Sequence, residues 1–195
     1  MRGDDGSTGA WPDRGSMVRL DPQSLPAHVD RLYRAAWALC GSPHDAEDLV
    51  QETFARVLSR PRMLRDGSGS SEAVELAYLM RALRNTFLNT RRTASRRPRV
   101  TSTLDEIEAA DPRAGDQPER AIEAGELYAA IAELPEDFRL ALVAVDIVGL
   151  SYAQAGRVLG VPEATVTSRL HRARRRVVAR IDEPAPEDAR EGSSL

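Results

Sequence analysis

The 195-residue sequence contains no lysine, one cysteine, three histidines and no long apolar run. A lone cysteine, Cys40, excludes an internal disulfide and leaves too few thiols for a cysteine-based metal site. Because the histidines are scattered, we expect neither a metal site nor a cofactor. The apolar run near residues 140–145 is too short to span a bilayer, and no apolar segment follows a basic start. The sequence therefore predicts a cytoplasmic protein without membrane insertion.

Arginines and acidic residues are segregated along the chain. All 27 basic residues are arginine, against 30 acidic residues, so the net charge is −3. Residues 78–99 hold seven arginines and no acid, and residues 165–181 hold six arginines and no acid. Between them, residues 103–126 hold eight acids and two arginines. Two basic segments separated by an acidic one indicate two points of contact with one polyanion.

The apolar pattern of the chain is helical. No segment alternates between apolar and polar residues over the length of a strand, so we expect no sheet. Low apolar content predicts a disordered start over residues 1–24, a flexible loop over 61–71, an acidic linker over 98–120 and a disordered acidic tail over 182–195. The sequence thus predicts an all-α fold with helices over residues 26–40, from 43 onward, 72–92, 121–133, 136–148, after Ser151, and 163–181.

The helix expected over residues 72–92 has two distinct faces at about 100° per residue. One side gathers the apolar residues Leu76, Leu79, Met80, Leu83 and Phe87. The opposite side gathers Tyr78, Arg81, Asn85, Asn89 and Arg92, with no acid among them. An ordinary solvated face would mix glutamate with arginine, so this stripe favours a contact with nucleic acid over that alternative.

The last two helices form a helix-turn-helix pattern. Ser151 and Gln154 make a capping box at the start of the first, and residues 159–162 make a tight turn before the second. The outward residues of the second helix are Thr167, Ser168, His171, Arg172 and Arg175. An exposed helix of this width fits the major groove of DNA. Two helices of a generic bundle remain the alternative.

Two segments resemble conserved regions of the bacterial sigma-70 family of sigma factors. The fourth region is matched by LPEDFRLALVAVDIVGLSYAQAGRVLGVPEATVTSRLHRARRRV, and the second by DAEDLVQETFARVL, residues 45–58. YLMRALRNTFLNTRR then follows where the promoter-melting segment should lie. The third region is absent, which is similar to the extracytoplasmic-function (ECF) group. The resemblance implies region 2 over residues 25–97 and region 4 over residues 121–181, two small helical domains joined by the flexible acidic linker.

The resemblance also implies partners and residue roles. Core RNA polymerase would be bound through the clamp helices of its largest subunit and the flap of the second, and an anti-sigma factor is a further partner that the family allows. Residues at the family's clamp-helix position are Asp45, Asp48, Gln51, Glu52 and Phe54. The −10 element would meet the stripe from Tyr78 to Arg92, with Asn85 lining a pocket for a flipped base and the 61–71 loop closing over it. The −35 element would meet Thr167, Ser168, Arg169, His171, Arg172 and Arg175, while Arg169 and Arg174 suit phosphate contacts or packing.

Three positions depart from the family pattern. Tyr78 stands where tryptophan is frequent, Thr167 where lysine or arginine is frequent, and the pair Ala155 and Gly156 replaces a frequent Ile-Ala pair. Tyr78 weakens the expected stacking at the upstream edge of the opened DNA, and Thr167 shifts the expected sequence preference at the −35 element. Ala155 and Gly156 imply a thinner core in the helix-turn-helix. The −10 and −35 elements lie about two helical turns apart, roughly 70 Å. The 23 residues 98–120 reach roughly 76 Å when extended.

The predicted function is that of a sigma factor that directs polymerase to promoters and helps to open the −10 region. We expect no enzyme, because the sequence has no Gly-rich phosphate loop, nucleophile motif or metal cluster. The main alternative is a stand-alone helix-turn-helix regulator that binds duplex DNA without polymerase. A second alternative is an anti-sigma-like or scaffold bundle that binds polymerase but no promoter.

Overall fold

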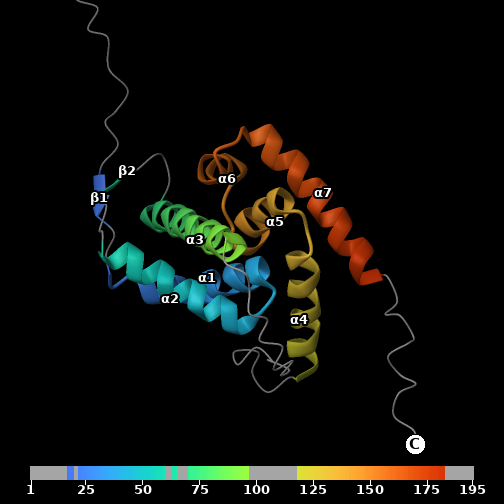
Figure 1. Ribbon diagram of the computed structural model, residues 1–195. Helices are drawn as coiled ribbons and strands as arrows, with labels where there is room; N and C mark the ends of the chain where they lie inside the picture. Colours follow the sequence, from blue (N-terminus) through green and yellow to red (C-terminus); the bar gives the residue numbers. More distant parts are fainter. Residues whose placement is uncertain (1–16, 20–21, 60–62, 66–69, 97–117, 183–195) are drawn as a thin grey trace, which may run out of the picture.

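The computed structural model describes residues 17–19, 22–59, 63–65, 70–96 and 118–182 (Figure 1). Almost all of these residues are helical, which confirms the predicted all-α fold of two small domains. In chain order the elements are β1 (Met17–Arg19), α1 (Leu25–Cys40), α2 (Pro43–Ser59), β2 (Met63–Arg65), α3 (Ser71–Arg96), α4 (Pro118–Ala132), α5 (Glu136–Leu142), the π-helix η1 (Val143–Ile147), α6 (Tyr152–Leu159) and α7 (Glu163–Asp182).

The first domain consists of α1, α2 and α3 packed against one another. The apolar face predicted for α3 lies in its core, where Leu79, Met80 and Leu83 are almost fully buried together with Leu32 and Leu39 of α1. Within this core lies one polar pair, in which the His28 Nε2 is 3.3 Å from the Glu75 Oε2. Burying two polar groups together lets each satisfy the other. The pair thereby ties α1 to α3.

The second domain consists of α4 to α7 and contains the predicted helix-turn-helix. Ser151 accepts a hydrogen bond from the Gln154 backbone N–H, and the Gln154 side chain accepts one from the Ser151 N–H, so the capping box forms as expected. Gly160 ends α6 at φ 73°, a left-handed conformation that glycine adopts without steric cost. The capping box thus sets where α6 begins, and the turn at Gly160 lets the chain reverse into α7.

Several predicted boundaries and one predicted absence are wrong. Met17–Arg19 pairs antiparallel with Met63–Arg65, so part of the expected disordered start and part of the expected loop form a small sheet. Three-residue strands carry no readable alternation, and their pairing joins segments far apart in sequence, so local periodicity could not reveal them. α4 begins at Pro118, inside the expected linker, and α3 continues to Arg96. The helix expected over 136–148 changes to a π-helix after Leu142.

The two domains share one continuous core. α1 packs against α4, α5 and η1 of the second domain as well as against α2 and α3, and α3 also contacts α6 (Figure 1). The rest of the predicted linker, residues 98–117, lies outside the described residues. Among the described helices, none is both long enough and apolar enough to cross a membrane.

Candidate nucleic-acid interface

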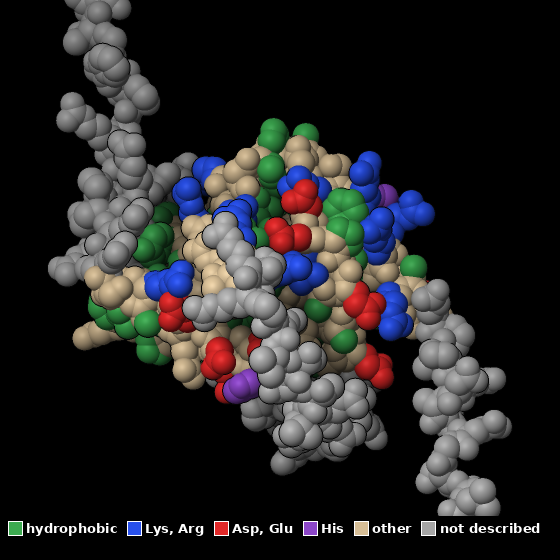
Figure 2. Space-filling view, in the orientation of Figure 1, with side chains coloured by type: hydrophobic (Ala, Val, Ile, Leu, Met, Phe, Trp, Pro, Cys, Tyr) green, Lys and Arg blue, Asp and Glu red, His purple; other side chains and the backbone are tan. Residues whose placement is uncertain are grey.

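α7 presents an outward face on the second domain. Thr167, Ser168, His171, Arg172 and Arg175 are all exposed, as the sequence predicts. The hydroxyl groups of the first two donate to their own helix, Thr167 Oγ1 to the Glu163 carbonyl at 3.1 Å and Ser168 Oγ to the Thr165 carbonyl at 3.0 Å. Their oxygens therefore face solvent as acceptors. Figure 2 shows arginine and histidine side chains gathered over this helix.

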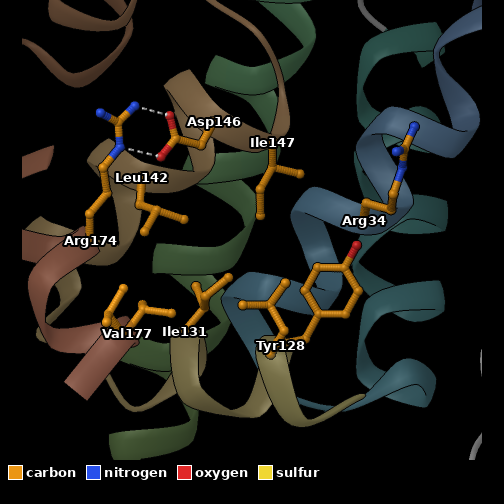
Figure 3. A pocket seen from close by; sticks show the side chains of 10 residues that line it. Arg34, Tyr128, Ile131, Leu142, Asp146, Ile147, Arg174 and Val177 are labelled. Carbon is orange, nitrogen blue, oxygen red and sulfur yellow. Dashed lines mark hydrogen bonds and ion pairs between the residues drawn. The ribbon is translucent and has the colours of Figure 1, made fainter. Parts of the chain in front are cut away.

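Other arginines of α7 are engaged within the domain. Arg169 Nη2 lies 2.7 Å from Asp137 Oδ2, and its side chain is only 24% exposed. Arg174 makes a bidentate pair with Asp146 at 2.6 and 2.9 Å (Figure 3). The hydrogen bonds and charge of Asp146 raise the pKa of the Arg174 guanidinium above its ordinary value. Of the roles open to Arg169 and Arg174, packing is the one that these contacts support.

The predicted −10 stripe runs along the solvent side of α3. Arg81, Asn85, Asn89 and Arg92 are exposed, and Tyr78 is half-buried against the core. The Asn85 Oδ1 accepts a hydrogen bond from Arg84 at 3.4 Å. The stripe therefore forms a surface on one helix, as predicted. Of the 61–71 loop that would close over Asn85, the structure describes only β2, Ser70 and the first residue of α3, Ser71.

The predicted polymerase-binding ridge lies on α2. Asp45, Asp48, Gln51 and Glu52 are exposed and Phe54 is half-buried, while the opposite side of α2 is buried against α1 and α3. Two of the acids are paired within the helix, Asp48 with His44 at 4.0 Å and Glu52 with Arg56. Exposed pairs of this kind contribute little to stability and can be exchanged for partner contacts.

An apolar groove that the sequence pattern did not predict lies between α4, η1 and α7 (Figure 3). It has a volume of about 370 Å³ and a largely apolar lining. Leu127 and Val178 at its rim are 39% and 58% exposed. The paired Arg174 and Asp146 lie at one end, and Arg34 of α1 lines the other, near the Tyr128 hydroxyl (Figure 3).

Two groups near the end of α1 have displaced pKa values. Burial raises the pKa of the Cys40 thiol to about 12, and the nearby Asp45 carboxylate adds to this effect. The thiol is therefore protonated at neutral pH, which makes it a poor nucleophile. Burial and the neighbouring Arg91 lower the pKa of Arg139. Among the described residues, no group of histidine, cysteine and acidic side chains could hold a metal ion.

Comparison with known proteins shows which protein family the chain belongs to. The family model described as Sigma-70 region 2 matches residues 26–97, and that described as Sigma-70, region 4 matches residues 124–177. The chain belongs to the sigma-70 family, in the group of ECF RNA polymerase sigma factors. Sigma factors direct transcription by RNA polymerase and are regulators rather than enzymes. The two domains are named region 2 (α1–α3) and region 4 (α4–α7) below.

Three similar proteins illustrate this relationship. The ECF sigma factor SigE of Mycolicibacterium smegmatis is 37% identical over 170 residues, which cover 86% of this chain and 63% of SigE. EcfG of Rhodopseudomonas palustris is 33% identical over 162 residues, covering 83% of this chain and 85% of EcfG. The solved structure of the sigma factor RpoE with the anti-sigma factor NepR from Bartonella quintana matches with a TM-score of 0.58 and 23% identity. It covers 84% of this chain and 97% of RpoE, and it supports the fold alone.

Proposed function

We propose that the chain binds core RNA polymerase, directs it to promoters with two separated elements and helps to open the −10 element. One observation carries the proposal: two exposed, acid-free stripes, on α3 and on α7, belong to two different domains of one chain. A chain with two such surfaces can contact one DNA molecule at two places. Polymerase would perform the chemistry, in the bacterial cytoplasm where promoter DNA lies.

The face of α7 would read the −35 element in the major groove. Arg172 and Arg175 reach outward, and an arginine can donate two hydrogen bonds to guanine or bind phosphates. Thr167 and Ser168 already donate to their own helix, so their oxygens would accept from the amino groups of cytosine or adenine. Arg169, held by Asp137, would support the helix rather than contact bases.

The stripe on α3 would hold the separated strands of the −10 element. Extruding a base from the duplex costs a few kcal/mol, which contacts to the flipped base and the backbone must offset. Asn85 offers an amide for the edge of a flipped base, and Arg81 and Arg92 offer charge for the phosphates. Tyr78 offers an aromatic surface at the upstream edge, although it is half-buried.

Polymerase would contact both domains. The acidic ridge of α2 suits the clamp helices of the largest subunit, because Asp45, Asp48 and Glu52 lie on successive turns of one exposed face. The apolar groove of region 4 suits the flap of the second subunit, because an apolar partner would cover Leu127 and Val178. Tethering both domains to one enzyme raises their effective concentration at the promoter.

An anti-sigma factor is a further proposed partner. The similar sigma factor RpoE was solved in complex with the anti-sigma factor NepR. For this chain, an anti-sigma factor would be recognised by its ability to release the chain from core polymerase when the purified proteins are mixed.

The test is reconstitution with core polymerase, followed by runoff transcription. We expect the chain to bind core polymerase and to give transcripts from specific start sites. Arg172→Ala should reduce these transcripts, while Arg180→Ala, on the same helix but paired with Glu133, serves as the control. A stand-alone regulator would instead bind duplex DNA tightly without polymerase. A scaffold that binds only polymerase would leave transcription unaffected by Arg172→Ala.

A further inference from the structure

The strand before α1 is paired with the connection between α2 and α3. β1 and β2 run antiparallel, and their Cα partners are Met17 with Arg65, Val18 with Leu64, and Arg19 with Met63. Residues 20–24 join β1 to α1, whereas β2 follows α2 in the chain. The pairing therefore ties the chain ahead of α1 to a point within the α2–α3 connection, which would otherwise be held only at its two ends. We call the paired strands the β1–β2 ribbon.

The β1–β2 ribbon is supported by α3. Two short strands alone are marginally stable, and packing against a helix is one way to stabilise them. β2 makes such a contact with α3, and Figure 1 shows the ribbon beside the end at which that helix begins. Pairing also gives partners to backbone N–H and C=O groups of both strands. β1 and α3 thus act together to hold β2 in place.

The β1–β2 ribbon lies near the start of the proposed −10 surface. The stripe on α3 begins at Tyr78, about two helical turns or roughly 10 Å after Ser71, the first residue of the helix. Arg81 follows after about one further turn. A change in the position of β2 would therefore be felt close to the residues assigned to the −10 element.

The charge of the β1–β2 ribbon is compatible with DNA nearby. Its six residues include Arg19 and Arg65 and no acid. Positive charge of this kind is attracted to phosphates irrespective of base sequence. The ribbon therefore would not repel a DNA strand held on α3.

We propose that β1 is a positioning element of the −10 site, which holds β2 against α3 and thereby sharpens the choice of −10 sequence. β1 acts through β2 and α3 and does not itself read bases. A strand that is already paired has lost backbone freedom before DNA arrives, so less entropy is lost on binding. This role rests on the proposed function, whereas the pairing of β1 with β2 does not.

The pairing can be tested in the full chain by disulfide formation. Arg19→Cys with Met63→Cys, in a Cys40→Ser background, places thiols on Cα partners. Such partners lie about 4.5–5.5 Å apart, within the range that a disulfide spans. Arg19→Cys with Glu126→Cys, an exposed position on α4, is the control. On oxidation with diamide we expect a disulfide in the first chain and only traces in the control.

A pair of prolines should break the pairing without touching a helix. Successive N–H groups of a strand point to opposite edges, so Met17→Pro with Val18→Pro removes a ladder donor whichever residue carries it. Gly9→Pro with Ala10→Pro makes the same change eight residues earlier. We expect the first pair to lower the disulfide yield about fivefold, the shift expected for one lost hydrogen bond, and the second pair to leave it unchanged. Helical circular dichroism should be the same for both.

Holoenzyme provides the second readout, on a promoter identified from the start sites of the parent chain. Met17→Pro with Val18→Pro should lower the preference for the intact promoter over a −10 mutant by about fivefold, again the effect of one lost hydrogen bond. The preference over a −35 mutant should not change, and Gly9→Pro with Ala10→Pro should alter neither preference.

The outcomes separate the pairing from its role. A disulfide yield no higher than that of the control overturns the β1–β2 ribbon, whether or not polymerase binds. Loss of the disulfide in the proline variant with an unchanged −10 preference overturns the role of β1. If the parent chain gives no transcripts with core polymerase, the proposed function fails and the −10 role fails with it, while the disulfide still reports the pairing.

Discussion

The two proposed DNA-binding surfaces are supported in different ways. α7 packs on α4, α5 and α6 through its buried apolar residues, and two of its arginines pair with acids of the same domain, Arg169 with Asp137 and Arg174 with Asp146. α3 is a 26-residue helix whose inner face packs on α1 and α2, and Arg81 on its outer side has no ion-pair partner among the described residues. The difference suits a role for α7 in reading duplex DNA and a role for α3 in holding separated strands. It also shows that a count of arginines overstates the number available to DNA.

The largest expected effect is the loss of binding to core polymerase, without which neither surface would be brought to the promoter. Asp48→Arg should abolish binding to core polymerase without unfolding the chain, because a like charge at a charged interface costs several kcal/mol. Glu126→Arg, an exposed acid on α4, is the matched charge reversal. A pull-down with core polymerase measures both. Normal binding of the Asp48→Arg chain would remove the ridge on α2 from the interface.

Gly156→Ala should break the support of α7 while leaving α3 intact. A Cβ at Gly156 would lie 2.8 Å from the Val161 carbonyl oxygen in the turn. Overpacking of this kind costs about 1–3 kcal/mol, and the denaturation midpoint reports it. Gly125→Ala is the control, since a Cβ there meets nothing within 4 Å. It should stabilise α4 by about 0.5–1 kcal/mol. Equal stability of the two variants would contradict the tight crossing of α6 with α7.

Comparing Arg172→Ala with Arg169→Ala separates an arginine that is exposed for DNA contact from one that is paired within the domain. We expect holoenzyme bearing Arg172→Ala to lose about 1–3 kcal/mol of binding at the −35 element. Arg169→Ala should lose less binding and more stability, because it breaks the pair with Asp137. Competition binding with promoter and mutated promoter DNA measures the first effect and chemical denaturation the second. The reverse order would assign Arg169 to DNA.

The smallest expected effect concerns Cys40. Its pKa is about 12 in the folded chain and 9.0 ordinarily, so the unfolded chain loses the proton first as pH rises. The thiol therefore leaves stability unchanged below pH 9 and lowers it between pH 9 and about 12. Cys40→Ala should lessen that alkaline loss relative to the parent chain, measured by denaturation at pH 8 and pH 10.5. Rapid alkylation of the native thiol at pH 8 would contradict its burial.

The sequence predicts the helices well, because local signals specify them. Ser151 and Gln154 predict a capping box, Gly41 and Gly160 predict helix ends, and each of these appears in the structure. The exposed residues of α2, α3 and α7 also lie where periodicity places them. Their roles in binding remain predictions, because a single chain shows exposure and not its partners.

The contact between the domains was not predicted, although α1 carries a signal for it. Leu32 and Leu39 lie on one side of α1 and Trp37 and Ala38 on another, and all four are buried. A helix that is apolar on both sides is expected to be buried on both. The hydrogen bond from Arg139 to the Leu39 carbonyl joins residues 100 positions apart, and local pattern cannot show such a contact. The π-helix at Val143–Ile147 is a further feature that the sequence did not predict.

The most direct measurement maps the 5′ ends of RNA made on genomic DNA by core polymerase with and without the purified chain. The account predicts new start sites in the presence of the chain, each preceded by two shared sequence elements about two helical turns apart. Arg172→Ala should weaken the use of these sites without creating others. Unchanged start sites, or new sites sharing a single element, would contradict recognition by two surfaces on one chain.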